Sequence, residues 1–166
     1  KLAIDKPFAE KFNGGETPFE YIILSGYQML KENPGSCSKG IDRIEESKQI
    51  VSKWKEGIPN HILHFEIAST QDKVIRKALL DIIATEADSI GFNERELIDM
   101  LEVIGQNELA SKCDKAPTST NLFNGMLKVF EYTGCPRLQL HMFGLYITLQ
   151  KKGFQITPKQ NRNGMQ

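Results

Sequence analysis

The stretch HILHFEIASTQDKVIRKALLDIIATEADSIGFNERE, at residues 61–96, decides the expected fold of this chain. It begins with a short apolar run at 61–68, which is typical of a buried strand. Apolar residues at helical spacing follow as far as Thr85, and 88–92 is a second strand-like run. A strand, a helix and another strand in this order predict a βαβ unit with parallel strands.

The chain on either side of this stretch continues the same alternation. We expect helices at 8–12, 41–54, 94–104, 121–132 and 143–152, strands at 19–24 and 137–142, and a polar surface excursion at 106–120. Ser69 and Thr70 are the expected N-caps of the central helix, because a hydroxyl oxygen accepts hydrogen bonds from the free amides of a first turn. Residues 1–18 read as an approach segment and 155–166 as a polar tail.

The repeated alternation predicts one α/β domain, with helices on the faces of a mostly parallel sheet. The 166 residues suit one such domain, and a hydrophobic content of 40% and a charged content of 25% are ordinary for a globular protein. In open sheets of this kind, ligands bind beyond the carboxyl ends of the strands. Polar residues at those ends are therefore the candidates for function.

Composition excludes several classes of function. The formal net charge is zero, whereas a protein that grips nucleic acid phosphates needs clustered Lys and Arg, so we expect no nucleic acid partner. No apolar run approaches the roughly 20 residues that span a bilayer, so we expect no membrane partner. The cysteines Cys37, Cys113 and Cys135 form no CxxC pair, which favours free thiols in a reducing compartment, the cytoplasm.

The first candidate pair is His64 and Glu66, which lie two residues apart on the expected strand and therefore share one face of it. Burying a charge without a partner costs several kcal/mol, so Glu66 must face solvent, meet a cation or bind a hydrated metal ion. The alternative is that the strand lies at an edge of the sheet and that both side chains are solvated.

The second candidate pair is Asn93 and Glu96, three residues apart at a junction between strand and helix. Their spacing also predicts a capping box, which is the structural alternative to a functional role. Because Glu66 and Glu96 follow successive strands, we expect both carboxylates in one crevice, beside a helix N-terminus that attracts phosphate oxygens. Two carboxylates that hold Mg²⁺ through water next to such a site suit phosphoryl transfer.

Other residues near strand ends are further candidates. Gly26 allows close approach of a ligand, and Gln28 offers both a donor and an acceptor to sugar hydroxyls, although the same residues also suit an ordinary turn. Lys73, in a first helical turn, is placed either to meet a phosphate or to be solvated. His141 is a candidate for the crevice, and Arg137 is a basic candidate whose place at a strand start favours the surface.

Four short motifs occur in order along the chain: SGYQ at 25–28, HFEIAS at 64–69, NERE at 93–96 and RLQLHM at 137–142. Together they resemble the Gly-x-Gln, HxE, NxxE and Arg-x-His-x-His-Thr segments of the ADP-dependent sugar kinases. These are the ADP-specific glucokinases and phosphofructokinases of the ribokinase-like superfamily. The resemblance implies a three-layer α/β/α fold, of which this chain is part of the large domain.

The resemblance also implies a reaction, in which the β-phosphoryl group of ADP passes to a hexose or a hexose phosphate in cytoplasmic glycolysis and AMP is released. By the same resemblance, the motif residues fall into three groups, namely Glu66 and Glu96 that organise Mg²⁺, His64 and Asn93 that support them, and Gly26 and Gln28 that contact the sugar. ADP and the sugar are thus the expected partners.

The departures from the family pattern limit this expectation. The family's catalytic Asp lies in a GxGD motif, which does not occur in these 166 residues. Gln139 and Met142 stand where the family tends to have His and Thr, and Lys73 stands where many members carry Arg. Because the sequence resembles the middle third of such an enzyme, we expect an incomplete portion that is inactive by itself.

Two alternatives to a kinase portion remain open. The absence of GxGD favours a non-catalytic α/β module that uses the crevice only to bind a ligand or a partner, and residues beyond Gln166 in the parent gene would decide between the two. A purely structural domain, with Glu96 acting only as a cap, is the other alternative. It predicts that Glu96→Gln leaves metal affinity unchanged.

Overall fold

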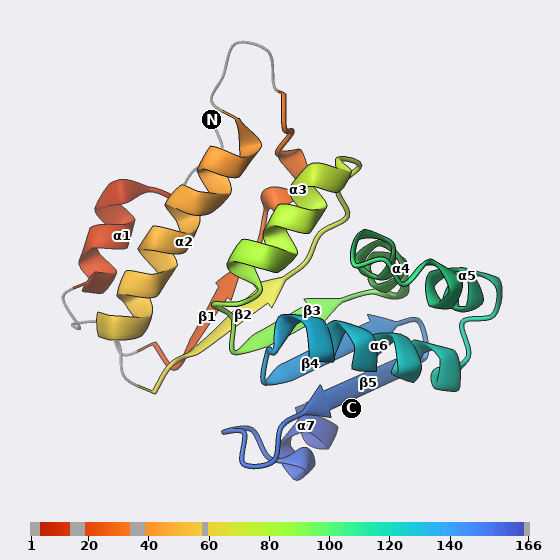
Figure 1. Cartoon of the computed structure of the whole chain (residues 1–166). Helices are drawn as coiled ribbons and strands as arrows, with labels where there is room; N and C mark the ends of the chain where they lie inside the picture. Colours follow the sequence, from red (N-terminus) through yellow and green to blue (C-terminus); the bar gives the residue numbers. More distant parts are fainter. Residues whose placement is uncertain (1–3, 14–18, 34–38, 58–59, 165–166) are drawn as a thin grey trace.

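The computed structural model describes residues 4–13, 19–33, 39–57 and 60–164 (Figure 1). Its sheet has five strands in the order β1-β2-β3-β4-β5. Their bounds are Tyr21–Leu24 for β1, Ile62–Glu66 for β2, Ser89–Phe92 for β3, Arg137–Met142 for β4 and Leu145–Gln150 for β5. The first four pair in parallel and β5 pairs antiparallel with β4, which confirms the expected mostly parallel sheet.

Helices connect these strands. Their bounds are Lys6–Asn13 for α1, Gly40–Gly57 for α2, Lys73–Ala78 for α3, Glu94–Val103 for α4, Asn107–Lys115 for α5, Ser119–Thr133 for α6 and Pro158–Gly164 for α7. A 3₁₀ turn, η1 at Tyr27–Met29, follows β1, and a π-helical turn, η2 at Leu79–Ile83, continues α3. No helix among the described residues is both long enough and apolar enough to cross a membrane.

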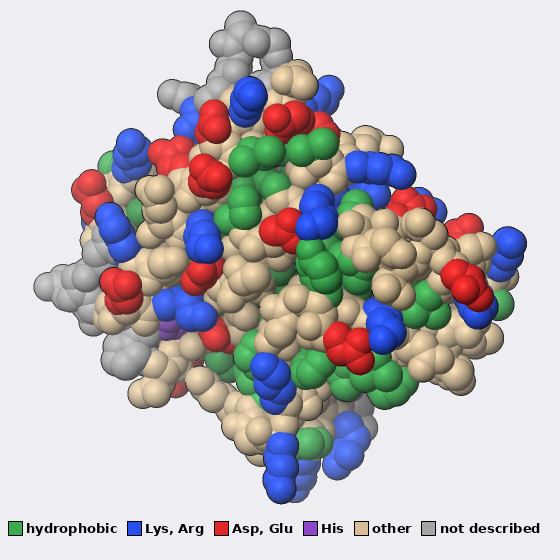
Figure 2. Space-filling view, viewed as in Figure 1, with side chains coloured by type: hydrophobic (Ala, Val, Ile, Leu, Met, Phe, Trp, Pro, Cys, Tyr) green, Lys and Arg blue, Asp and Glu red, His purple; other side chains and the backbone are tan. Residues whose placement is uncertain are grey.

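One face of the sheet is apolar and covered by helices. Strand order follows chain order, and right-handed crossovers that always step in one direction place α2, α3 and α6 on the same face, as Figure 1 shows. Alternate residues of the four parallel strands point to that face, namely Leu24, Leu63, Phe65, Ile90, Phe92, Leu138 and Leu140, and all are buried. The helical layer itself is solvated on its outside, where Lys, Arg, Asp and Glu side chains intermingle (Figure 2).

The opposite face of the sheet is polar. It carries the other alternate residues, among them His64, Glu66, Ser89 and Arg137. Helix α7 lies against this face, because Asn161 accepts a hydrogen bond from Arg137 Nη2 at 2.8 Å. The polar tail expected at 155–166 therefore contains a helix that belongs to the third layer of a partial α/β domain.

The helix expected at 143–152 is wrong, since this segment forms the strand β5. Gly144 adopts a φ of 76°, which lets a tight turn reverse the chain after β4. Leu145 then pairs with Met142, and Ile147 with Leu140. Alternating apolar residues along β5 extend the apolar face, so cross-strand packing decides the structure of this segment.

The surface excursion expected at 106–120 is also wrong in part, because α5 occupies most of it. Its buried residues, Ala110 and Cys113, pack against α4 and α6. The expected caps of α3 are corrected too. Asp72 caps the helix instead of Ser69 or Thr70, since its Oδ1 accepts from the amides of Val74 and Ile75.

The two cysteines within the described residues are free thiols, as expected. Cys113 and Cys135 are both free and buried, and burial raises the pKa of Cys135 to about 12. A thiol with so high a pKa is unreactive at neutral pH. Cys37 lies outside the described residues, as do residues 1–3 and 14–18 of the approach segment.

Candidate functional site

The carboxyl ends of β2 and β3 place Glu66 and Glu96 near each other. Glu66 is the last residue of β2 and lies in register with Gly91 of β3, and Glu96 lies in the first turn of α4, which follows β3. Burial is the main cause of the raised pKa of Glu96, and the negative charge of nearby Glu66 adds a smaller effect in the same direction. The two carboxylates selected from the sequence thus share one end of the sheet.

Glu66 lies between two histidines. Its Oε2 is 2.9 Å from His64 Nε2, and its Oε1 is 3.7 Å from His141 Nε2. The side chain of Glu66 is 34% exposed, whereas that of His64 is only 8% exposed. Glu66 therefore presents a carboxylate to solvent, while its orientation is set by a buried ring.

Gly91 leaves the space that this carboxylate fills. A Cβ built on Gly91 would lie 2.0 Å from Glu66 Oε2 and 2.8 Å from His64 Nε2, both shorter than real Cβ contacts. Glycine within a strand commonly marks the close approach of another group. The carboxylate of Glu66 can lie across β3 only because residue 91 has no side chain.

Glu96 and Asn93 form the expected capping box of α4. The amide of Asn93 donates to Glu96 Oε2 at 2.8 Å, and the amide of Glu96 donates to Asn93 Oδ1 at 2.9 Å. The hydroxyl of Ser69 also donates to Glu96 Oε1 at 3.3 Å. These hydrogen bonds confirm the capping role of Glu96, which is buried. Its role toward a metal ion stays a prediction.

The donor set suits a hydrated Mg²⁺ ion. Mg²⁺ prefers oxygen ligands, keeps several water molecules and is commonly held by one or two carboxylates. Glu66 offers a partly exposed carboxylate, and Glu96 lies near it at the same end of the sheet. Among the described residues, no group of three or more His, Cys, Asp or Glu side chains could hold a metal directly.

The proposed sugar residues lie at the same end of the sheet. Gly26 lies two residues after the end of β1 with a φ of 98°, a conformation that favours glycine, and it precedes the 3₁₀ turn that contains Gln28. Gln28 is exposed, whereas its neighbour Tyr27 is buried and packs edge-on against Phe65, with 5.8 Å between ring centroids. The turn is anchored on Tyr27 and presents Gln28 outward.

The three basic candidates are placed differently. His141 lies beside Glu66 at the carboxyl end of the sheet. Lys73 is 74% exposed and pairs with Glu102 at 3.5 Å. Arg137 is 5% exposed at the amino end of β4, so the expected surface position is wrong. Only His141 of the three joins the carboxylates.

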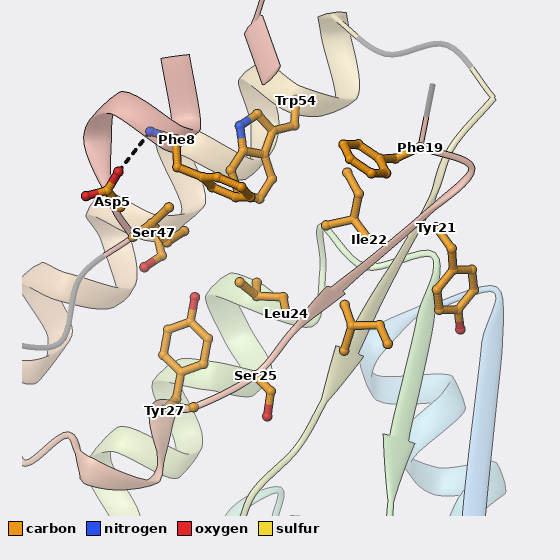
Figure 3. Close-up of a pocket in the computed structure, with 13 residues that line it drawn as sticks. Asp5, Phe8, Phe19, Tyr21, Ile22, Leu24, Ser25, Tyr27, Ser47 and Trp54 are labelled. Carbon is orange, nitrogen blue, oxygen red and sulfur yellow. Dashed lines mark hydrogen bonds between the residues drawn. The ribbon is translucent and has the colours of Figure 1, made fainter. Parts of the chain in front are cut away.

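An apolar cleft of about 750 Å³ lies beside β1, apart from the carboxylates (Figure 3). Aromatic side chains line much of it, with Phe8 from α1, Trp54 from α2 and Phe19 and Tyr21 from the β1 segment. Asp5 is the one carboxylate among the described residues that line it, and it accepts a hydrogen bond from the amide of Phe8 at 2.9 Å. This cleft follows the edge strand, since β1 is the first strand of the sheet.

Three residues near the carboxylates were missed from the sequence. Ser89 contacts His64, Gly91 makes room for Glu66, and Ser69 donates to Glu96. The glycine in the run SIGF was the available signal, because an interior strand glycine indicates a close approach. Ser69 and Ser89 carried no comparable signal, since their partners lie 27 and 25 residues away.

Loss of the proton from Glu96 should make the folded chain less stable as pH rises. Burial is the largest cause that raises its pKa, opposed by bonds from the Asn93 amide and the Ser69 hydroxyl. The folded chain then holds this proton more tightly than the unfolded chain, so the free energy of unfolding falls as pH rises from 4.5 through the raised pKa.

Glu96→Gln should lose this part of the pH dependence while keeping a side chain that suits the capping box. Urea unfolding in EDTA, at pH values from about 4 to about 7, measures the effect for the native chain and the variant. An equal pH slope for both proteins would contradict the prediction.

Comparisons with known proteins point to one family. A family model described as the ADP-specific phosphofructokinase/glucokinase conserved region matches residues 1–166. An ADP-specific phosphofructokinase of Methanosarcina acetivorans is 30% identical over 168 residues, which cover 99% of this chain and 34% of that protein. An ADP-dependent glucose/glucosamine kinase of Pyrococcus furiosus is 28% identical over 151 residues, which cover 89% of this chain and 31% of that protein.

Solved structures give the same result. An ADP-dependent kinase in complex with fructose-6-phosphate and ADPβS matches with a TM-score of 0.89 and 29% identity, over 99% of this chain and 36% of the other. The last common ancestor of ADP-dependent phosphofructokinases from Methanosarcinales matches with a TM-score of 0.87 and 29% identity, over 98% of this chain and 34% of the other. The chain spans about a third of the length of the proteins it matches.

Proposed function

The chain belongs to the ADP-specific phosphofructokinase/glucokinase family, and from this premise we propose that it forms part of an enzyme that transfers the β-phosphoryl group of ADP to a hexose or a hexose phosphate, releasing AMP. The family match over residues 1–166 confirms the resemblance carried by the four motifs. Matching relatives are named for both phosphofructokinase and glucose kinase activity, so the proposal includes both sugar classes.

The observation that carries this proposal is the setting of Glu66. Its exposed carboxylate lies between His64 and His141 at the carboxyl end of a parallel sheet, where ligands of open α/β sheets bind. Glu96 lies beside it, in the first turn of α4. The N-terminus of this helix favours negative charge, which suits the phosphates of ADP.

Glu66 and Glu96 would hold Mg²⁺ through water molecules, with His64 and Asn93 fixing the two carboxylates. When bound, Mg²⁺ neutralises the charge on the phosphoryl oxygens. His64 limits the rotation of Glu66 through the contact at 2.9 Å, and Asn93 ties Glu96 to the start of α4. These side chains thus contribute orientation and negative charge before the reaction begins.

Gln28 and Gly26 would contact the sugar at the carboxyl end of β1. His141 would lie on the other side of the sugar, beside Glu66. Gln28 is exposed at the carboxyl end of β1, where its amide can both donate and accept. We do not extend the phosphate role to Lys73 or Arg137, because Lys73 pairs with Glu102 and Arg137 is buried at the amino end of β4. The proton of the sugar hydroxyl needs an acceptor that GxGD would supply, and these 166 residues contain no GxGD.

Mn²⁺ binding tests the metal part of this proposal, because Mn²⁺ accepts the same oxygen ligands as Mg²⁺ and broadens nearby NMR signals. The chain has three histidines, so their ring signals can be assigned one by one. We expect Mn²⁺ to broaden the signals of His64 and His141 more strongly than that of His61, and excess Mg²⁺ to reverse the effect. Equal broadening of all three rings would contradict the proposed site.

The purified chain should release no AMP from ADP in the presence of glucose or fructose 6-phosphate. The reason is that the residues assigned to the site hold metal and sugar but include no acceptor for the sugar proton. A coupled assay for AMP measures this, with the heat-denatured chain as the blank. Steady turnover well above that blank would refute the assignment.

A non-catalytic ligand-binding module is the second candidate, and the missing GxGD favours it. A binding module would make the same metal and sugar contacts as the kinase, so Mn²⁺ binding supports both proposals. Turnover by the chain would exclude the binding module. A location in the cytoplasm stays a prediction.

A further inference from the structure

We infer that Ser89 and Arg137 are positioning residues for Glu66, and that they act through the ring of His64. The three side chains form a line across the polar face of the sheet, with one residue each on β4, β3 and β2. The catalytic consequence rests on the proposed metal-holding role of Glu66. The orientation of the His64 ring does not rest on that role, because the hydrogen bonds alone determine it.

The direction of these hydrogen bonds is fixed from both ends. A guanidinium group can only donate, so Arg137 Nη1 donates to Ser89 Oγ at 2.8 Å. An ionised carboxylate can only accept, so the contact of 2.9 Å between His64 Nε2 and Glu66 Oε2 requires a proton on Nε2. In a neutral imidazole the other nitrogen, Nδ1, must then accept.

Ser89 supplies the hydrogen that Nδ1 accepts. Its Oγ lies 2.9 Å from His64 Nδ1 and has one hydrogen to donate, while its lone pairs receive the bond from Arg137. The line therefore runs in one direction, from the guanidinium through the hydroxyl and the ring to the carboxylate. The opposite tautomer would place a lone pair of Nε2 against the carboxylate of Glu66.

Burial holds this line in place. Ser89 is 0% exposed and Arg137 is 5% exposed, so neither can exchange its partner for bulk water. Asn161 of α7 accepts a second bond from Arg137 at 2.8 Å, and Tyr21 stacks on the ring of His64 with 5.8 Å between centroids. Buried polar groups with defined partners adopt one arrangement, because each lost bond leaves a desolvated group unpaired.

The line explains how distant residues set the exposed carboxylate. Glu66 is the only part exposed enough to reach a ligand, whereas Arg137 lies at the amino end of β4, away from it. Removing a partner behind a metal ligand commonly weakens metal binding 10- to 100-fold, roughly, because the ligand loses its orientation. His64 has this relation to Glu66 directly, and Ser89 and Arg137 have it through His64.

The test is the tautomer of His64, read from ¹⁵N shifts of the ring in the full chain at about pH 8. We expect the Nε2–H form in the native chain. Observation of the Nδ1–H form, or of a doubly protonated ring, would overturn the inference, and this measurement needs no variant that folds.

Ser89→Ala should then leave Nδ1 of His64 without its donor, loosen the ring against Glu66 and weaken Mn²⁺ binding about 10-fold, and Arg137→Gln should have the same effect on Mn²⁺ binding. Ser111→Ala and Arg162→Gln are the matched controls, since both residues are exposed and lie outside the line. A folded Ser89→Ala protein that keeps both the native ¹⁵N shift of His64 Nδ1 and the native Mn²⁺ affinity would overturn the inference. If the native chain binds no Mn²⁺ but Ser89→Ala still moves the ¹⁵N signal of Nδ1 toward that of a nitrogen without a hydrogen-bond donor, the metal-holding function fails and the positioning line stands.

Discussion

A single methyl group at Gly91 should remove the metal site almost as completely as loss of the carboxylate itself. In Gly91→Ala, the new Cβ would lie 2.0 Å from Glu66 Oε2 and 2.8 Å from His64 Nε2. The carboxylate must move away, because the strand backbone on which the Cβ stands is held in register with β2 and β4. We expect Mn²⁺ affinity to fall about 100-fold, the upper end of the range for a disturbed metal ligand.

Titration of Mn²⁺ by electron paramagnetic resonance measures this loss, with Glu66→Gln as the reference for an absent carboxylate. Gly164→Ala is the matched control, since a Cβ at Gly164 would meet nothing within 4 Å and its φ is not left-handed. The free energy of unfolding separates a local effect from general damage. Native affinity in a folded Gly91→Ala protein would show that Glu66 does not bind metal from its place across β3.

Replacement of Arg76 by Met should cost about 3 kcal/mol of stability, the lower end of the range for breaking a buried ion pair. Arg76 Nη2 lies 3.0 Å from Asp99 Oδ2, and their side chains are 11% and 8% exposed. Arg76 also donates to the carbonyl of Thr70 at 2.6 Å. The variant leaves a buried carboxylate with one partner fewer and a buried carbonyl without its donor.

Arg95→Met is the matched control for this prediction, because Arg95 pairs with the same Asp99 at 3.0 Å but is 58% exposed. An exposed pair contributes about 1 kcal/mol or less, so the control should lose little stability. Urea unfolding compares the two variants. Equal losses would mean that burial of the Arg76 pair is not the source of its stabilisation.

The Arg76 variant should also disturb the candidate site. Thr70 follows Ser69, whose hydroxyl donates to Glu96 at 3.3 Å, so the bond to Thr70 helps to hold this segment against α4. In Arg76→Met we therefore expect the signal of the Ser69 amide to shift in ¹H–¹⁵N spectra, whereas Arg95→Met leaves it in place. The segment at residues 69–70 would thus connect the buried ion pair of Arg76 to the candidate site.

The sequence predicted the parallel sheet well, and the reason is local. Runs such as ILHFE and SIGF are short, apolar and bounded by polar residues, which is typical of a buried strand. The segments LYITLQ and NELASKCDK were predicted wrongly, because the structure of each depends on a neighbour. β5 forms because it pairs with β4. Only Ala110 and Cys113 of α5 are buried, so this helix has a weak apolar pattern in the sequence.

The candidate site divides in the same way. The sequence by itself determined the carboxylates, Glu66 and Glu96, because a charge at the end of an apolar strand or at the start of a helix is visible within a few residues. Only the tertiary structure decided that Ser89 lies against His64, that Gly91 lies beneath Glu66 and that Arg137 is buried. The physical reason is that neighbours across a sheet are set by strand register, which folding fixes between segments far apart in the chain.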